Sequence, residues 1–263
     1  MHVIGVDWAA SDETKCGLAL AELNDEGSLV VVELLTGREA PERRSAPQVV
    51  AWLRHHPDAV LSIDAPLGWP ARLADGVAAH VAGEPLGLMA DASAFFTRAT
   101  DRFIQQQLRK SPLEVGADRI ARTAFSALCL IRELREATGL PLRMAWDPGE
   151  RGILEVYPAA TLKVLALGTK IPPYKKPEQH DARRAIAALL ANHVRFTTAQ
   201  RQRAIDSDHL LDAILCTLAG ADFERRYAMP PPPEARELAR REGWIWVRAS
   251  PLTATASSYG GLR

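Results

Sequence analysis

Three segments rich in apolar and β-branched residues open the chain, and the turns between them are too short to hold a helix. The segments cover residues 2–7, 16–23 and 28–35. Consecutive strands joined by tight polar turns pair antiparallel, because a parallel pair needs a crossover of a dozen or more residues. The opening of the chain therefore predicts an antiparallel meander of three strands.

A helical pattern at residues 47–55 follows the meander and leads to a fourth apolar strand at residues 59–64. A strand reached through a helix is expected to run parallel to an earlier strand, with a right-handed crossover. The order β-β-β-α-β therefore predicts an α/β fold. Its mixed sheet combines the meander with parallel strands, and helices flank the sheet.

The rest of the chain is predicted to add helices and short strands to this core. Residues 71–146 read as a helical insertion, with its best helices at 101–110 and 118–136. Further elements are expected at 152–158 (strand), 159–167 (helix, ended by Gly168), about 183–192 and 206–226 (helices) and 243–247 (edge strand). We expect one domain at residues 1–229 and a C-terminal extension at 230–263, in the same domain or appended to it, with a loose end at 253–263.

Charge and cysteine content limit the possible functions. The net charge is zero and the pI is near 7.1, so contact with nucleic acid would need a local basic patch. The three cysteines have no CxxC spacing, which argues against a zinc cage or a disulfide framework and favours the reducing cytoplasm. We expect no membrane span and no secretion signal, because no apolar run is long enough and no basic N-terminal region precedes one.

Several carboxylates stand in otherwise apolar surroundings. Asp7 ends the first strand, Asp64 ends the fourth, and Glu155 lies within a later strand. In the last long helix, His209 and Asp212 share a face with small residues, where a solvated face would carry long lysines and glutamates. Such acids are costly to bury unless they are paired or bind a metal, and oxygen ligands suit Mg²⁺ or Mn²⁺.

Each acid also has a plain structural alternative. Backbone amides could satisfy Asp7, Asp64 could cap the loop that follows it, and Glu155 could point to solvent from an edge strand. Asp208 is equally well placed to be the N-cap of the last long helix. Asp212 is hardest to explain in this way, because it lies mid-helix among small residues.

Basic side chains are candidates for contact with phosphates. The insertion is the most basic part of the chain and includes Arg98 and Arg102, and a charged loop later carries Lys175, Lys176 and Arg183. The alternative is that these side chains belong to solvated helix faces. Trp8, directly after Asp7, either blocks a nucleic-acid groove or offers a surface on which a base stacks.

Taken together, these residues resemble a known group of proteins. The β-β-β-α-β order with its spaced acids is similar to the ribonuclease-H-like superfamily, and the stretch from Asp208 to Ala213 is similar to the closing motif of RuvC-type resolvases. Over about residues 1–225 the chain resembles the predicted RNase-H-like nucleases, a domain-of-unknown-function family. The matching pieces are Gly5-Val6-Asp7, Ile63-Asp64-Ala65-Pro66-Leu67-Gly68-Trp69-Pro70, Arg98 with Asp101, Glu155-Val156-Tyr157-Pro158, Lys175-Lys176 with Arg183, and His209 to Ala213.

The resemblance implies a metal-dependent phosphodiesterase fold in which Asp7, Asp64 and Asp212 hold Mg²⁺ or Mn²⁺, with Glu155 and His209 as additional catalytic residues. Two positions depart from the family pattern. Trp8 stands where glycine is common and would narrow the mouth of the site, and His209 stands where aspartate is frequent and would lower its negative charge.

Three hypotheses about function follow. The first is a nuclease that hydrolyses nucleic acid by two-metal-ion chemistry. The second is a phosphotransferase of the actin and sugar-kinase type, against which stands the lack of a glycine-rich phosphate loop. The third is a non-catalytic binding or scaffold protein that keeps the acids for structure.

Overall fold

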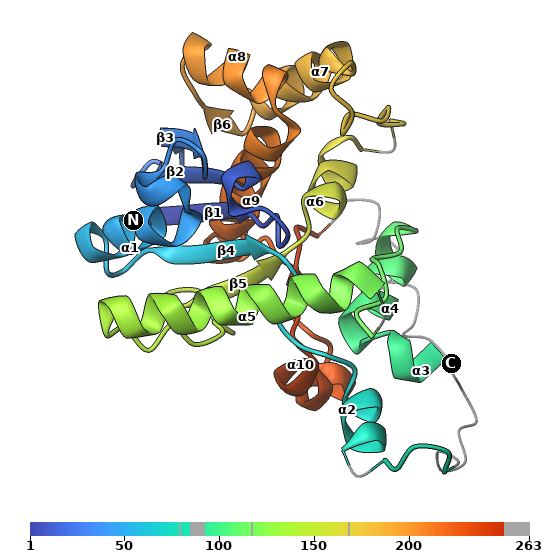
Figure 1. Ribbon diagram of the computed structural model, residues 1–263. Coiled ribbons are helices and arrows are strands. Elements are labelled where there is room, and N and C mark those ends of the chain that lie inside the picture. The colour runs from blue at the N-terminus through green and yellow to red at the C-terminus, as the bar shows by residue number, and fades with distance from the viewer. Residues whose placement is uncertain (79, 85–92, 117, 168, 250–263) are drawn as a thin grey trace.

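The computed structural model describes residues 1–78, 80–84, 93–116, 118–167 and 169–249 (Figure 1). Gly168 and the C-terminal residues 253–263, on which the sequence made predictions, lie outside the described residues. In the described part, the strands are β1 (His2–Asp7), β2 (Gly17–Leu23), β3 (Leu29–Thr36), β4 (Val60–Asp64), β5 (Ile153–Val156), β6 (Val194–Arg195) and β7 (Ile245–Trp246).

The helices fall into an N-terminal group, an inserted group and a C-terminal group. They are α1 (Ser45–His55), α2 (Ala71–Val77), α3 (Ser93–Phe96), α4 (Ala99–Leu108), α5 (Asp118–Thr138), α6 (Pro158–Leu165), α7 (His180–Leu190), α8 (Thr198–Asp206), α9 (Asp208–Glu224) and α10 (Arg236–Glu242). Short 3-10 turns lie at Glu13–Lys15, Pro41–Arg43 and Pro233–Ala235. Among the described residues, none of these helices has the length and apolar character needed to cross a bilayer.

The described strands form one mixed sheet in the order β6-β3-β2-β1-β4-β5-β7. Antiparallel pairing of β1 with β2 and of β2 with β3 confirms the predicted meander. Strand β4 lies beside β1 and runs parallel to it, which confirms the parallel strand predicted after the first helix. The sequence also correctly predicted an edge strand near the C-terminus, since β7 pairs with β5 at one end of the sheet.

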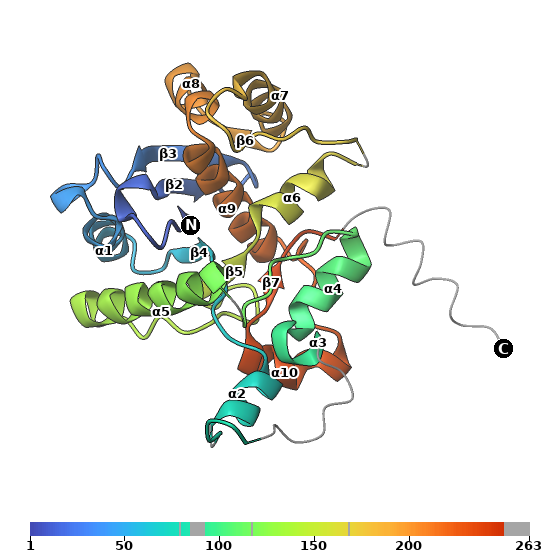
Figure 2. The same ribbon diagram turned by 45° about the vertical axis from the view of Figure 1, so that its right-hand side comes forward.

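Helices cover both faces of the sheet (Figure 2). On one face, Ile4 and Val6 of β1 pack in a core with α1 and α5. On the other face, α9 lies across β1, β2 and β4, and its apolar side chains form a core with β2, β3, α6 and α7. Successive side chains of a strand point to opposite faces, so Val3, Gly5 and Asp7 face α9.

Glycines allow α9 to lie very close to the sheet. A Cβ atom at Gly5 would overlap the carbonyl oxygen of Ala213, and one at Gly17 would overlap the carbonyl oxygen of His209. On the helix side, a Cβ atom at Gly220 would overlap the hydroxyl of Ser62 on β4. This close approach brings the first turns of α9 beside the carboxyl ends of β1 and β4.

The inserted helices α2 to α5 lie between β4 and β5 in the chain, and a buried ion cluster ties them to the C-terminal segment. The guanidinium of Arg98 bonds both Asp101 and Glu155 and also donates to the carbonyl oxygen of Glu242 at 3.1 Å. The carboxylate of Glu242 in turn accepts from the backbone amides of Ala71 and Ala99. These bonds join α2, α4, β5 and α10 into one body.

Candidate functional site

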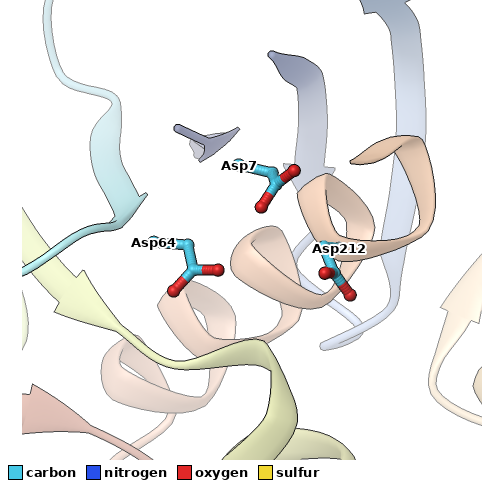
Figure 3. A group of neighbouring side chains, drawn as sticks. All are labelled: Asp7, Asp64 and Asp212. Carbon is cyan, nitrogen blue, oxygen red and sulfur yellow. The ribbon is translucent and has the colours of Figure 1, made fainter. Parts of the chain in front are cut away.

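Three aspartates meet where β1 and β4 end and α9 begins (Figure 3). Asp7 and Asp64 are paired neighbours in the parallel register of β1 and β4. Both face α9, because Asp7 lies two residues after Gly5, and Asp64 two after Ser62. Together with Asp212 of α9, each offers a carboxylate oxygen, and these oxygens lie within 4.8 Å of one another. This buried acidic triad could bind a metal ion.

The electrostatics of the triad favour a bound cation. Burial, followed by the charges of Asp7 and Asp212, raises the pKa of Asp64 well above its usual value. Burial, opposed by Lys175 and reinforced by Asp7, raises the pKa of Asp212 to about 7. Like charges this close disfavour ionisation of one another, so a multivalent cation would relieve a repulsion that the fold imposes.

Lys175 and Tyr174 supply positive charge and a hydrogen bond to the triad. The ammonium of Lys175 bonds Oδ2 of Asp212, and the hydroxyl of Tyr174 donates to Oδ1 at 3.0 Å. Desolvation lowers the pKa of Lys175, but attraction to Asp212 and Asp7 outweighs it and raises that pKa overall. The Lys175 side chain is 55% exposed while Asp212 is fully buried, so the ammonium reaches the triad from the solvent side.

Arg183 holds the segment that carries these two residues. Its buried guanidinium donates to four backbone carbonyls: those of Tyr174, Lys176, Pro177 and Ile205. The sequence predicted that Arg183 contacts phosphate. The structure places it inside the protein instead, because three loop carbonyls and one carbonyl from the last turn of α8 accept from its guanidinium. Arg183 therefore positions Tyr174 and Lys175.

His209 lies at the edge of the triad, as expected from its place on α9. Its Nδ1 is 2.5 Å from Oδ2 of Asp7. This hydrogen bond raises the pKa of His209 above its usual value, although partial burial opposes the shift. Bonding through Nδ1 leaves Nε2 as the nitrogen that can exchange a proton with a ligand.

Glu155 lies outside the triad, in contrast to its predicted catalytic role. It pairs with Ile63 in the register of β4 and β5, and so points to the face opposite Asp64. There its two oxygens accept from Arg98 at 2.7 and 2.9 Å, and Oε2 also accepts from the amide of Leu67 at 3.0 Å. The same pairing buries Arg98, so the two charges neutralise each other inside the protein, where both residues also line a small pocket that includes Asp64 and Trp8.

Of the other residues predicted to contact substrate, Trp8 and Arg102 are wholly or partly buried, and Lys176 is exposed. Trp8 is 8% exposed, packs in the core and donates from its indole nitrogen to Ser126 at 2.8 Å, so little of its ring is available for a base to stack on. Arg102 is partly buried and donates to the carbonyl of Thr97 at 2.6 Å. Lys176 is exposed beside Lys175 and keeps the position expected of a phosphate contact.

Sequence reasoning missed Tyr174 as part of the site. The signal was present: Pro172 and Pro173 directly precede Tyr174 and Lys175. Two prolines fix φ and remove amide donors, so they keep a segment out of helix and extended. An extended segment that ends in an aromatic residue and a lysine can reach a buried acid from the solvent side.

The raised pKa of Asp212 predicts how stability depends on pH without metal. Between about pH 4 and about pH 7 the folded protein keeps a proton that the unfolded chain releases, so the free energy of unfolding falls as pH rises through this window. Each proton held in this way lowers the free energy of unfolding by about 1 kcal/mol for each pH unit. We expect urea denaturation in EDTA to show the fall and Asp212→Asn to reduce it.

The matched control, Asp208→Asn on the same helix, should keep the wild-type slope; equal slopes in all three proteins would contradict the prediction.

Comparison with known proteins gives a family for the chain. Residues 5–236 match the model of the family described as "Protein of unknown function (DUF429)". No curated protein and no solved structure matches the chain. The family match includes all three aspartates, His209 and the Tyr174–Lys175 segment. Because it spans most of the sequence, the chain belongs to the DUF429 family.

Proposed function

We propose that this protein is a metal-dependent nuclease with a ribonuclease-H-like fold, which hydrolyses phosphodiester bonds of nucleic acid with Mg²⁺ or Mn²⁺. The observation that carries the proposal is the convergence of Asp7, Asp64 and Asp212, with carboxylate oxygens within 4.8 Å of one another. The three come from the first strand, its parallel neighbour and the last long helix. That arrangement supports the ribonuclease-H-like assignment, which the sequence resemblance suggested.

The donor set fits a hard divalent cation. All three groups are carboxylates, and Mg²⁺ and Mn²⁺ prefer a few such oxygens together with water and substrate phosphates. Cys216, on the same helix, is buried and its thiol donates to the carbonyl of Val6, so among the described residues the metal-binding group at this place consists of carboxylates alone. A bound pair of such ions would activate water and neutralise charge at the phosphate, which is the two-metal-ion chemistry that the sequence predicted.

The chain's own residues would orient the substrate and handle protons. Asp7 holds His209 through Nδ1 at 2.5 Å, so the raised pKa favours an imidazolium whose Nε2–H can donate to a leaving oxygen. The ammonium of Lys175, exposed on the solvent side of Asp212, would attract the scissile phosphate. Tyr174 fixes the orientation of Asp212 by donating to its other oxygen.

A cleavage assay tests the proposal. Purified protein is incubated with labelled single-stranded DNA, single-stranded RNA, both duplexes and the hybrid, in Mg²⁺, in Mn²⁺ and in EDTA. We expect cleavage with either metal and none in EDTA, and no cleavage by Asp212→Asn. Intact substrates in every metal, under conditions where a control nuclease cuts them, would contradict the proposal and favour a non-catalytic binding role.

Replacing Lys175 tests its place beside the metal ligands. Its ammonium occupies an oxygen of Asp212 and repels a dication. We therefore expect Lys175→Met to bind Mn²⁺ about tenfold more tightly, which corresponds to about 1.4 kcal/mol, while cleavage slows. Isothermal titration calorimetry measures the affinity. Lys176→Met, one residue away and exposed, is the control for metal affinity and should bind Mn²⁺ as wild type does; weaker Mn²⁺ binding by Lys175→Met would mean that the ammonium does not compete.

A further inference from the structure

A large groove opens beside the triad. It measures about 900 Å³ and lies between the end of α4, one side of α6 and the segment of residues 169–176. Its floor is mostly apolar and includes the exposed side chains of Leu167, Pro172 and Pro173. Leu167 is 64% exposed, and an apolar side chain of this size left open in a concave surface is typical of a binding site.

The rim of the groove is strongly basic. Among its described lining residues there are six basic side chains and no acidic one, although the whole chain carries no net charge. The six are Arg109, Lys110, Lys163, Lys170, Lys175 and Lys176. Two of them directly follow α4 (Arg109 and Lys110), Lys163 lies on α6, and the other three lie in the segment after α6, so every part of the lining contributes positive charge. This is the local basic patch that a neutral protein needs to bind a polyanion.

The groove and the triad share Tyr174 and Lys175 as neighbours. Both residues line the groove, and both bond Asp212. Its walls are held together, since the ammonium of Lys163 on α6 donates to the carbonyl of Arg109 at the end of α4 at 3.0 Å. Figure 2 shows α4 and α6 side by side. A chain bound in the groove at Tyr174 and Lys175 would therefore lie one residue away from Asp212 of the triad.

We infer that this groove binds a single-stranded segment of nucleic acid, with phosphates on the basic rim and bases on the apolar floor. The inference rests on the proposed function, because it names the substrate class of the same site. In a duplex the faces of the bases are stacked on one another, and only phosphates and base edges are accessible. A duplex therefore gains no apolar contact with the floor of the groove. Unpaired bases expose flat apolar faces, and single strands are bound by basic grooves that cover those faces.

Binding is measured without cleavage, by fluorescence anisotropy of labelled single-stranded DNA, single-stranded RNA and duplex DNA of one sequence, in EDTA at several salt concentrations. We expect either single strand to bind at least about tenfold more tightly than the duplex, and the DNA and RNA arms identify the preferred sugar. The double variant Lys110→Gln/Lys170→Gln changes one lysine after α4 and one after α6. In this variant the slope of log affinity against log salt should become shallower by about 1.4. Each phosphate contact to a single strand contributes about 0.7 to that slope.

The apolar floor is tested separately. Leu167 has a φ of 47°, a left-handed conformation that asparagine tolerates, so Leu167→Asn removes the apolar surface without straining the backbone. We expect single strands to bind about tenfold more weakly with an unchanged salt slope, since the variant loses apolar contact with a base but no phosphate contact. The matched control for charge is Arg132→Gln/Arg151→Gln, two exposed sites not among the groove's lining residues, which should bind as wild type.

The outcomes separate this inference from the proposed nuclease function. Equal or tighter binding of duplex, or single-strand binding that both groove variants leave unchanged, would overturn the inference even if the protein cleaves nucleic acid. Single-strand binding that depends on the groove residues supports it even if no metal produces cleavage, in which case only the catalytic proposal fails. Absence of binding to every probe up to about 0.1 mM protein, the weak end of non-specific affinities, overturns the inference.

Discussion

Asp64→Asn is expected to reduce metal-dependent cleavage about a thousandfold or more, on the scale of removing one member of a catalytic group, and at the same time to stabilise the protein in EDTA. Asparagine keeps the shape of the side chain but cannot ionise, whereas burial and the charges of Asp7 and Asp212 raise the pKa of Asp64 and so make its ionisation costly in the folded protein. Activity and stability should therefore change in opposite directions, which is typical of a residue kept for function at a cost in stability.

Thermal denaturation with and without Mn²⁺ completes this test. Wild type should gain stability with Mn²⁺ by mass action, and Asp64→Asn should gain much less. The matched control is Asp25→Asn, an exposed acid in the turn between β2 and β3, at the opposite end of the meander. A variant that is less stable in EDTA, with its gain from Mn²⁺ intact, would show that Asp64 serves the fold and not a metal.

Arg98→Met is expected to lower the free energy of unfolding by about 3–5 kcal/mol, because removing one partner of a buried ion cluster leaves the others without compensation. Arg98 is buried and pairs with both Asp101 and Glu155, so methionine would leave two buried carboxylates facing each other. Urea denaturation measures the loss, with Arg102→Met in the first turns of α4 as the control expected to lose less than about 1 kcal/mol.

A double variant separates a structural role from a role in binding. If Glu155 is held only by its ion pair, Glu155→Gln should destabilise wild type but cost much less in the Arg98→Met background, since coupled residues are not additive. A stable Arg98→Met protein with weakened nucleic-acid affinity would contradict this structure and support the phosphate contact that the sequence suggested.

Much of the triad could be predicted from the sequence because its geometry follows from simple periodicities. A strand reached through a helix lies parallel to its neighbour, which places Asp7 and Asp64 at the same edge of the sheet. Asp212 followed from the helical repeat, since it shares a face with small residues that allow close packing. The sequence shows the glycines that let α9 lie against the sheet, but it does not show their purpose. The α9 carbonyls that they contact belong to residues about 200 positions later in the chain.

The errors have equally specific causes. All four residues of β5 are buried, so no alternation of apolar and polar residues revealed which face Glu155 occupies. Arg98 and Arg183 looked like surface charges, because a sequence does not show which carboxylates or loop carbonyls will surround a guanidinium. The short α8 was missed because only Ala204 and Ile205 are buried along it, which is too little for an apolar stripe to show.

The distance along the chain between Asp7 and Asp212 also determines when the site can exist. During translation at about 5–20 residues per second, roughly 10–40 s separate the appearance of these two residues. Until α9 emerges and docks against Gly5 and Gly17, the growing polypeptide has two of the three aspartates and no covering helix. If the protein is a nuclease, a nascent chain still attached to its ribosome and messenger RNA would carry no working centre, and a prematurely terminated product would never acquire one.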